Sequence, residues 1–144
     1  MRQIMVVYWS GTGNTEMMAE AIGKGAAAAD IRVNVVPVGK AAPQDIFAAD
    51  AVALGCPSMG VEVLEETEME PFVQSLEGEE LTGKPLALFG SFDWGDGQWM
   101  RDWQERMEKS GVRLVAEGLA VNNTPDEAGL LLCRELGAKL AAVV

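Results

Sequence analysis

The sequence predicts an α/β fold, a doubly wound three-layer sandwich in which one five-stranded parallel sheet lies between two layers of helices. Segments rich in β-branched and apolar residues alternate along the chain with segments whose apolar residues recur at helical spacing. Several of the β-rich segments are continuous apolar runs, which is typical of strands covered by helices on both faces. Strands are expected at residues 4–9, 31–38, 51–55, 85–91 and 112–121.

The first expected strand is followed by a short loop and then by a helix, whose apolar positions are Met17, Met18, Ala21 and Ile22. Further helices are expected at residues 43–48, 68–76, 97–110 and 125–142. No internal repeat or linker divides the 144 residues, and this length suits one compact core. Residues 1–144 are therefore expected to form a single domain with a single site.

Composition argues against several classes of protein. The chain has no run of about 18 apolar residues and no signal-peptide pattern at its start, so a soluble, cytoplasmic protein is expected. Cys56 and Cys133 are far apart and form no CxxC pair, which indicates buried free thiols and no disulfide framework. The absence of histidine argues against hydrolytic triads and most zinc chemistry.

Acidic residues are concentrated in one segment. The formal net charge of −11 repels nucleic acid and anionic lipid, so neither is expected as a partner, and it favours partners that present a basic face. Evenly spread acid would serve solubility alone. Here, however, glutamates without any Lys or Arg between them occupy one stretch: Glu62, Glu65, Glu66, Glu68, Glu70, Glu77, Glu79 and Glu80. This stretch predicts a negative field around one site.

The loops after the first, third and fourth expected strands are candidates for the site. In a doubly wound sheet, ligands bind at the carboxyl ends of the strands, where the strand order reverses. These loops, at residues 10–15, 55–62 and 90–99, meet at that edge, and each has an unusual composition.

The first loop predicts a phosphate-binding site. It reads Ser10, Gly11, Thr12, Gly13, Asn14, Thr15 and leaves backbone N–H groups free at the positive end of a helix, beside three hydroxyls and an amide. The loop contains no Lys or Arg, so dipoles alone would hold the phosphate. The alternative is an ordinary helix cap by Asn14 or Thr15. The loop fits neither GxxxxGK[ST] nor GxGxxG, since no Lys follows Gly13 and Glu16 occupies the third glycine position.

The second and third loops predict a clamp for a planar ligand. The second contains Met59, Gly60 and a carboxylate, and the third places Trp94 among glycines and acids, where a core residue would be badly placed. A flat ligand between Met59 and Trp94 would explain both. Taken singly, a Met or Trp near a strand end more often packs in the core, so the prediction depends on all three loops sharing one edge.

The chain resembles the short-chain flavodoxins, close to the clostridial type, almost from end to end. The resemblance rests on residues 8–16, 54–56, 59–60, 62–66, 88–91, 94–97, 99–101 and 124–127. It implies the strand order 2-1-3-4-5 and a monomer that binds FMN noncovalently. Flavodoxins are themselves a standard example of ligand binding at the switch point, so this placement of FMN is inherited and not an independent prediction.

The resemblance also implies a function and roles for the site residues. The protein would be a low-potential one-electron carrier and not an enzyme, shuttling FMN between semiquinone and hydroquinone to link larger redox enzymes. Ser10, Thr12, Asn14, Thr15 and Ser91 would hold the phosphate, Met59 and Trp94 would flank the isoalloxazine, the Gly60–Val61 peptide would face flavin N5, and Glu62 would bond the pyrimidine edge. The complete set of expected FMN contacts is Ser10, Gly11, Thr12, Gly13, Asn14, Thr15, Pro57, Ser58, Met59, Gly60, Val61, Glu62, Ser91, Phe92, Asp93, Trp94 and Gly95.

Three residues depart from the family pattern. Pro57 replaces a serine near the phosphate, Phe92 replaces a tyrosine, and Asp93 replaces a glycine near the flavin's N1 and O2 edge. Each lost hydrogen bond should weaken FMN binding by about 1 kcal/mol without abolishing it. We also expect a four-residue turn from Met59 to Glu62 with positive φ at Gly60, because a β-branched residue such as Val61 disfavours it.

Two other functions are compatible with the fold class. An NAD(P)H-dependent quinone or flavin reductase would need room and usually basic groups for a second substrate, whereas these loops are acidic. A phospho-acceptor receiver domain would need clustered acids after the first strand, an Asp after the third and a Lys after the fifth. The residues at these places are Ser10-Gly11, Cys56-Pro57 and Asn122-Asn123.

Overall fold

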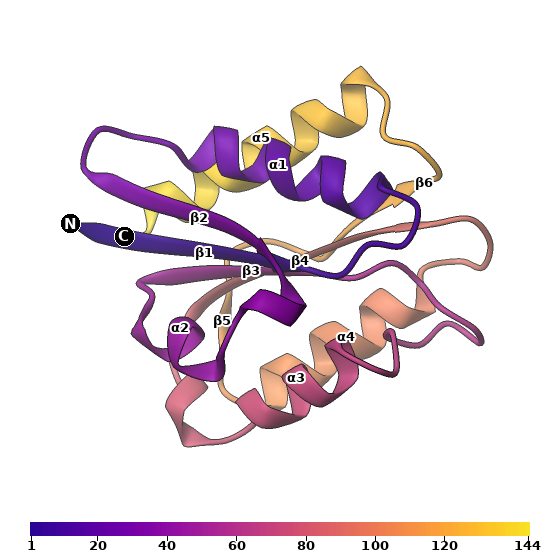
Figure 1. Cartoon of the computed structure of the whole chain (residues 1–144), viewed down its shortest axis with the longest axis horizontal. Coiled ribbons are helices and arrows are strands. Elements are labelled where there is room, and N and C mark those ends of the chain that lie inside the picture. Colours follow the sequence, from indigo (N-terminus) through magenta and orange to yellow (C-terminus); the bar gives the residue numbers. More distant parts are fainter.

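The computed structural model describes all 144 residues and has one parallel sheet between two layers of helices (Figure 1). The strands are β1 Arg2–Tyr8, β2 Ile31–Pro37, β3 Ala51–Gly55, β4 Pro85–Phe92, β5 Arg113–Leu114 and β6 Leu119–Asn122. The helices are α1 Asn14–Ala26, α2 Pro43–Ala48, α3 Met69–Leu76, α4 Gln98–Lys109 and α5 Glu127–Ala142, with short 3-10 turns at Val38–Lys40 and Glu79–Leu81. No helix of this chain is both long and apolar enough to cross a membrane.

The sheet has the order β2-β1-β3-β4-β5, with β6 also paired to β4, and every pairing is parallel. Within β1, Val6 lies opposite Val35 of β2 and Ala53 of β3. This order confirms the predicted doubly wound fold and the 2-1-3-4-5 arrangement.

The apolar run of β1 divides its side chains between two cores. Ile4 and Val6 pack in a cluster with residues of α1 and α5, whereas Met5 and Val7 pack in a second cluster with α2, α3 and α4. Figure 1 shows α1 and α5 above the sheet and α2, α3 and α4 below it. Because successive strand residues point to opposite faces, a strand covered on both faces needs apolar residues at every position.

The fifth expected strand is not continuous. One strand was predicted at residues 112–121, but the structure has two short strands, β5 and β6, which both pair with β4. Between them, the side-chain carbonyl of Gln104 on α4 accepts the N–H of Gly118, and a Cβ at residue 118 would lie 2.5 Å from Met100 Sδ. The chain bends at residues 115–117, and the N–H of Gly118 is bonded to α4 and not to a neighbouring strand.

Candidate functional site

The strand order creates a crevice at the carboxyl ends of β1 and β3. From β1 the chain passes to α1 on one face of the sheet, and from β3 it passes to α3 on the opposite face (Figure 1). The loop after β4 lies at the same edge, on the right in Figure 1. This edge is where a doubly wound sheet binds its ligand.

A cavity of about 150 Å³ opens at this edge and is lined by all three predicted loops. Its lining residues are Trp9, Gly11, Thr12, Pro57, Ser58, Met59, Ser91, Phe92 and Asp93. Eight of these nine were predicted from the sequence, and Trp9 was not. The remaining predicted residues do not line the cavity but lie in the same three loops: Ser10, Gly13, Asn14, Thr15, Gly60, Val61, Glu62, Trp94 and Gly95.

Neither Asn14 nor Thr15 caps helix α1, whose N-cap residue is Gly13. Ser10 Oγ accepts the N–H of Gly13 at 3.1 Å and that of Glu16 at 3.3 Å, and Gly13 precedes α1 with a φ of 96°. The hydroxyl of Thr15 is buried and pairs with Ser91 Oγ at 3.0 Å. This pair joins the loop after β1 to the end of β4.

Several backbone donors of this loop have no acceptor within the chain. The two hydrogen bonds accepted by Ser10 Oγ and a 3.4 Å bond from the N–H of Asn14 to Thr12 Oγ1 satisfy only some of the loop's N–H groups. The N–H groups left over are those of Ser10, Gly11, Thr12 and Thr15. Unpaired N–H groups at a helix amino end attract an anion, because the helix dipole is positive there.

The second loop is a tight hairpin. The backbones of Met59 and Val63 exchange two hydrogen bonds of 2.9 Å, and the hairpin has positive φ at Gly60 (50°) and at Glu62 (56°). The predicted four-residue turn from Met59 to Glu62 is therefore wrong, because the turn closes one residue later, at Val63. Positive φ falls on Gly60 as expected and not on Val61, but the second positive φ on Glu62 was not foreseen.

The third loop carries an exposed aromatic ring. Trp94 is 54% exposed and stacks on no other ring of the chain, whereas Phe92 packs against Trp99 with ring centroids 5.6 Å apart. The loop is joined to the second loop by Glu62, whose Oε1 accepts the N–H of Gln98, the first residue of α4, at 3.0 Å. Trp94 thus presents an exposed ring directly after Asp93, which lines the cavity.

Buried contacts behind the cavity hold these loops in place. The indole of Trp99 donates to the carbonyl of Cys56 at 3.1 Å, and the N–H of Ser58 donates to the carbonyl of Ser91 at 3.0 Å. Burial raises the pKa of the Cys56 thiol to about 12 and that of Cys133 to about 11. Both cysteines are free and buried, as predicted, and the raised pKa disfavours the thiolate form that a nucleophile needs.

A buried carboxylate supports the segment that leads into α3. Glu65 is only 6% exposed, and its oxygens accept hydrogen bonds from Thr67, Glu68 and Met69. Burial on its own would raise the pKa of Glu65, but these hydrogen bonds outweigh it and hold the pKa below its ordinary value. Glu65 therefore serves the fold of this segment and is not a free surface charge.

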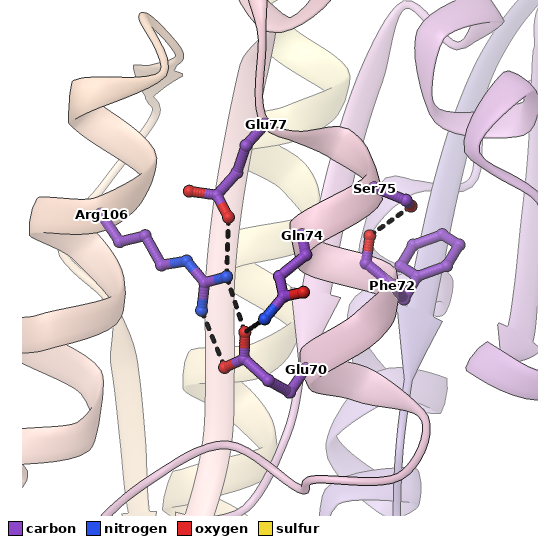
Figure 2. A network of polar contacts seen from close by, with 6 residues as sticks. All are labelled: Glu70, Phe72, Gln74, Ser75, Glu77 and Arg106. Atoms are coloured by element: carbon purple, nitrogen blue, oxygen red, sulfur yellow. Dashed lines mark hydrogen bonds and ion pairs between the residues drawn. The ribbon is translucent and has the colours of Figure 1, made fainter.

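The acidic stretch is partly neutralised by a residue that the sequence analysis missed. Figure 2 shows Arg106 of α4 donating to both oxygens of Glu70, at 2.9 and 2.7 Å, and to Glu77 at 2.7 Å. Its hydrogen bonds hold the pKa of Glu70 below the ordinary value, although burial opposes this. Arg106 lies 26 residues beyond the last glutamate of the stretch, so no local signal indicated the pair.

Trp9 is the other functional residue that sequence reasoning missed. It continues the apolar run of β1, so its position suggested a strand residue. The backbone N–H of Trp9 does donate to the carbonyl of Gly55 at 3.0 Å, but its ring lies against Gly11 and its indole donates to Glu68 at 3.2 Å. The one feature of the sequence that could have indicated a role for Trp9 in the site is its position directly before Ser10.

The fold and the site together define a mononucleotide-binding α/β protein, with an uncharged anion cradle and a cleft at the switch point of a parallel sheet. The family model for flavodoxin matches residues 6–137. A flavodoxin from Clostridium beijerinckii is 48% identical over 96% of this chain and 99% of its own, and one from Megasphaera elsdenii is 42% identical over 96% and 98%. The chain belongs to the flavodoxin family.

Solved structures agree with this assignment. The solution structure of two-electron reduced Megasphaera elsdenii flavodoxin superposes with a TM-score of 0.85, covering 96% of this chain and 98% of that one at 42% identity. A flavodoxin from the domain Archaea has a TM-score of 0.88 at 29% identity and covers 97% and 96%. The chain is accordingly an FMN-binding electron carrier that serves redox partners, and it is not an enzyme.

Proposed function

We propose that FMN binds in the cavity at the switch point, with its phosphate at the loop Ser10 to Thr15. The observation that carries this proposal is the set of unpaired N–H groups of Ser10, Gly11, Thr12 and Thr15 at the amino end of α1. The hydroxyl of Thr12 and the amide of Asn14 add polar groups to the same loop. No cation lies within the loop, so the phosphate keeps its charge and is held by dipoles.

Met59 and Trp94 are the proposed partners of the flavin ring. Met59 lines the cavity, and Trp94 has an exposed ring face that no other ring of the chain covers. We assign the Gly60–Val61 peptide to the N5 side of the ring and Glu62 and Asp93 to its pyrimidine side. Pro57, Ser58, Phe92 and Ser91 would line the remainder of the cleft.

Bound FMN supplies the chemistry, which is the reversible uptake of single electrons. The chain contributes shape and charge. Met59, Pro57 and Phe92 exclude water from the cleft, and the carboxylates of Glu62 and Asp93 oppose the arrival of further negative charge. One such charge in partly solvated surroundings is worth about 0.7 kcal/mol, or about 30 mV for a one-electron couple. Several acids together favour a low potential.

Titration with FMN and with riboflavin tests this assignment. FMN should bind at least about 100-fold more tightly than riboflavin, because two or more hydrogen bonds to a charged phosphate are worth about 3 kcal/mol or more. The measurement is calorimetry together with quenching of flavin fluorescence. Equal affinities for the two flavins would contradict a phosphate site in this loop.

We propose further that redox partners dock through a basic face on the acidic side of the cleft, and that the carrier is a monomer. The net charge of −11 and the exposed acids of the second and third loops, among them Asp93 in the cavity lining, support this arrangement. The rate of electron transfer to a basic partner should fall steeply as salt concentration rises, and sedimentation should give one chain per particle. An electron-transfer rate that does not change with salt concentration would contradict docking through a basic face.

We propose two further assignments, one for the domain organisation and one for the cellular location. Residues 1–144 would form one flavodoxin-like domain, because both core clusters pack on the same sheet. The protein would act in the cytoplasm, where free thiols such as Cys56 and Cys133 stay reduced. Limited proteolysis and cell fractionation test these two proposals.

A further inference from the structure

The carboxylate of Glu62 bridges two loops. Its own residue belongs to the hairpin closed by Met59 and Val63, and its Oε1 accepts the N–H of Gln98 at 3.0 Å, where α4 begins. The backbone of Glu62 has a φ of 56°, which is uncommon for a residue with a side chain. Such strain persists only where surrounding contacts hold it, and the bond to Gln98 is one such contact.

Gly95 makes this bridge possible. A Cβ built on Gly95 would lie 2.6 Å from the carboxyl carbon of Glu62 and 2.7 Å from its Oε1. An alanine at this position would therefore push the carboxylate away from the N–H of Gln98. The glycine at residue 95 is required by this close approach as well as by its φ of 85°.

The first turn of α4 makes further hydrogen bonds around Gln98. The side-chain amide of Gln98 donates to Asp102 at 2.8 Å, and its carbonyl accepts from Arg101 at 2.9 Å. Arg101 also donates to the backbone carbonyl and the carboxylate of Asp96, in the loop that carries Trp94. The N–H that receives Glu62 is thus fixed relative to the third loop, and it lies at the positive end of a 12-residue helix.

We infer that Glu62, Gly95 and the amino end of α4 form a latch that fixes the hairpin of Met59 relative to the loop of Trp94. Gly95 is a positioning residue in this latch, because it acts by leaving room for the carboxylate of Glu62. The consequence for FMN rests on the proposed function, in which Met59 and Trp94 flank the flavin. If the hydrogen bond from Gln98 to Glu62 were lost, the distance between Met59 and Trp94 would no longer be fixed. The carboxylate of Glu62 would also be free to leave the pyrimidine edge of the flavin.

A double-mutant cycle tests the latch, with Gly83→Ala as the matched control. Gly83 has a φ of 79°, close to that of Gly95, but a Cβ there meets nothing within 4 Å, and it lies before β4 at the opposite edge of the sheet. Gly83→Ala therefore reproduces the backbone strain without touching Glu62. Gly95→Ala should weaken FMN binding by about tenfold or more relative to Gly83→Ala, since a hydrogen bond to a charged group is lost.

The Glu62→Ala background separates two effects of Gly95→Ala, the contact of the new Cβ with the carboxylate of Glu62 and the backbone strain at residue 95. In this background the Cβ of residue 95 has no carboxylate to displace, so Gly95→Ala should weaken FMN binding no more than Gly83→Ala does. An effect of Gly95→Ala that is equally large with and without Glu62, or one no larger than that of Gly83→Ala in the intact chain, would overturn the latch as a determinant of binding.

Amide exchange in the FMN-free protein provides a readout that does not depend on the cofactor. Glu62→Ala and Gly95→Ala should each speed exchange of the Gln98 amide by about tenfold, the loss expected for one hydrogen bond to a charged acceptor, and Gly83→Ala should leave it unchanged. The amide of Met100, which donates to the carbonyl of Gly97, reports general fraying of α4. A Gln98 rate that does not change, or that rises only as much as that of Met100, would overturn the latch. If the wild-type chain bound no FMN, the proposed function would fail, and the Gln98 amide would still decide whether the latch exists.

Discussion

Replacing Glu65 by glutamine should destabilise the protein through loss of one buried carboxylate oxygen. One oxygen of Glu65 accepts the N–H groups of Glu68 and Met69, at 2.7 and 3.1 Å, and the other accepts the N–H of Thr67 at 2.9 Å and also its hydroxyl. Glutamine keeps one acceptor but turns an NH₂ group toward the donors of Thr67. Two hydrogen bonds to a charged group are worth about 3 to 6 kcal/mol, and the smaller desolvation cost of a neutral amide offsets part of this. We expect a net loss of about 2 to 4 kcal/mol in the free energy of unfolding.

The same substitution should make the free energy of unfolding depend less on pH in acidic solution. The pKa of Glu65 lies below its ordinary value of 4.5 in the folded protein. The ionised group therefore contributes stability that is fully present above 4.5 and is lost as the pH falls through the lowered folded pKa. The difference in stability between wild type and Glu65→Gln should be constant from neutral pH down to about pH 5 and shrink below it.

Urea denaturation of the FMN-free protein, followed by far-ultraviolet circular dichroism over a series of pH values, measures both effects. Glu66→Gln is the matched control, because Glu66 is the exposed neighbour and makes no hydrogen bond in the structure. Equal losses for the two variants, or a difference that persists unchanged to low pH, would refute the assignment of a buried, hydrogen-bonded carboxylate to residue 65.

Three further substitutions test the site and its surroundings. Trp94→Ala should weaken FMN binding by about 1 to 3 kcal/mol and restore flavin fluorescence in the bound state, and unchanged quenching would mean that Trp94 does not cover the ring. Asp93→Asn should raise the potential of the semiquinone/hydroquinone couple by a few tens of mV, about the effect of one nearby charge, and potentiometry at low salt measures this shift. Arg106→Gln should cost about 1 to 3 kcal/mol of unfolding free energy, because Glu70 and Glu77 lose a partner that is only 25% exposed, whereas Lys109→Gln, which breaks an exposed pair with Glu105, should cost less than about 1 kcal/mol.

The fold was predictable because its signals are local. In β1, the unbroken apolar run that starts at Ile4, with Ile4 and Val6 for one core and Met5 and Val7 for the other, distinguishes a strand buried on both faces from an amphipathic one. The loop from Ser10 to Thr15 likewise carries its chemistry in consecutive residues, because free backbone donors follow from glycines at a helix start. Gly11 and Thr12 of the cavity lining could be found in this way, whereas Pro57, Ser58, Met59, Ser91, Phe92 and Asp93 were predicted from the place of their loops at the sheet edge and from the family resemblance.

The features that were missed depend on contacts between distant segments. At the break between β5 and β6, Gln104 and Met100 of α4 reach Gly118, and no pattern within residues 112–121 reports the position of that helix. Arg106 meets Glu70 and Glu77 only because α3 and α4 lie side by side on one face of the sheet (Figure 2). A strand pattern or a charge count describes one segment at a time, so it cannot reveal such pairs.

The hairpin from Met59 closes at Val63, one residue later than predicted, and this shift changes which residues take a positive φ. With a four-residue turn, closed at Glu62, the choice of positive φ lies between Gly60 and Val61, and a β-branched Val61 would penalise one of the two turn types. With closure at Val63, the left-handed positions are Gly60 and Glu62, so in this conformation Val61 is free of that strain and is 83% exposed. The strained residue is therefore the one whose carboxylate reaches Gln98, and the bond at the start of α4 helps to hold a conformation that glutamate would otherwise avoid. Glu62 thus carries both the strained backbone of the loop beside the proposed flavin site and the side chain that attaches this loop to α4.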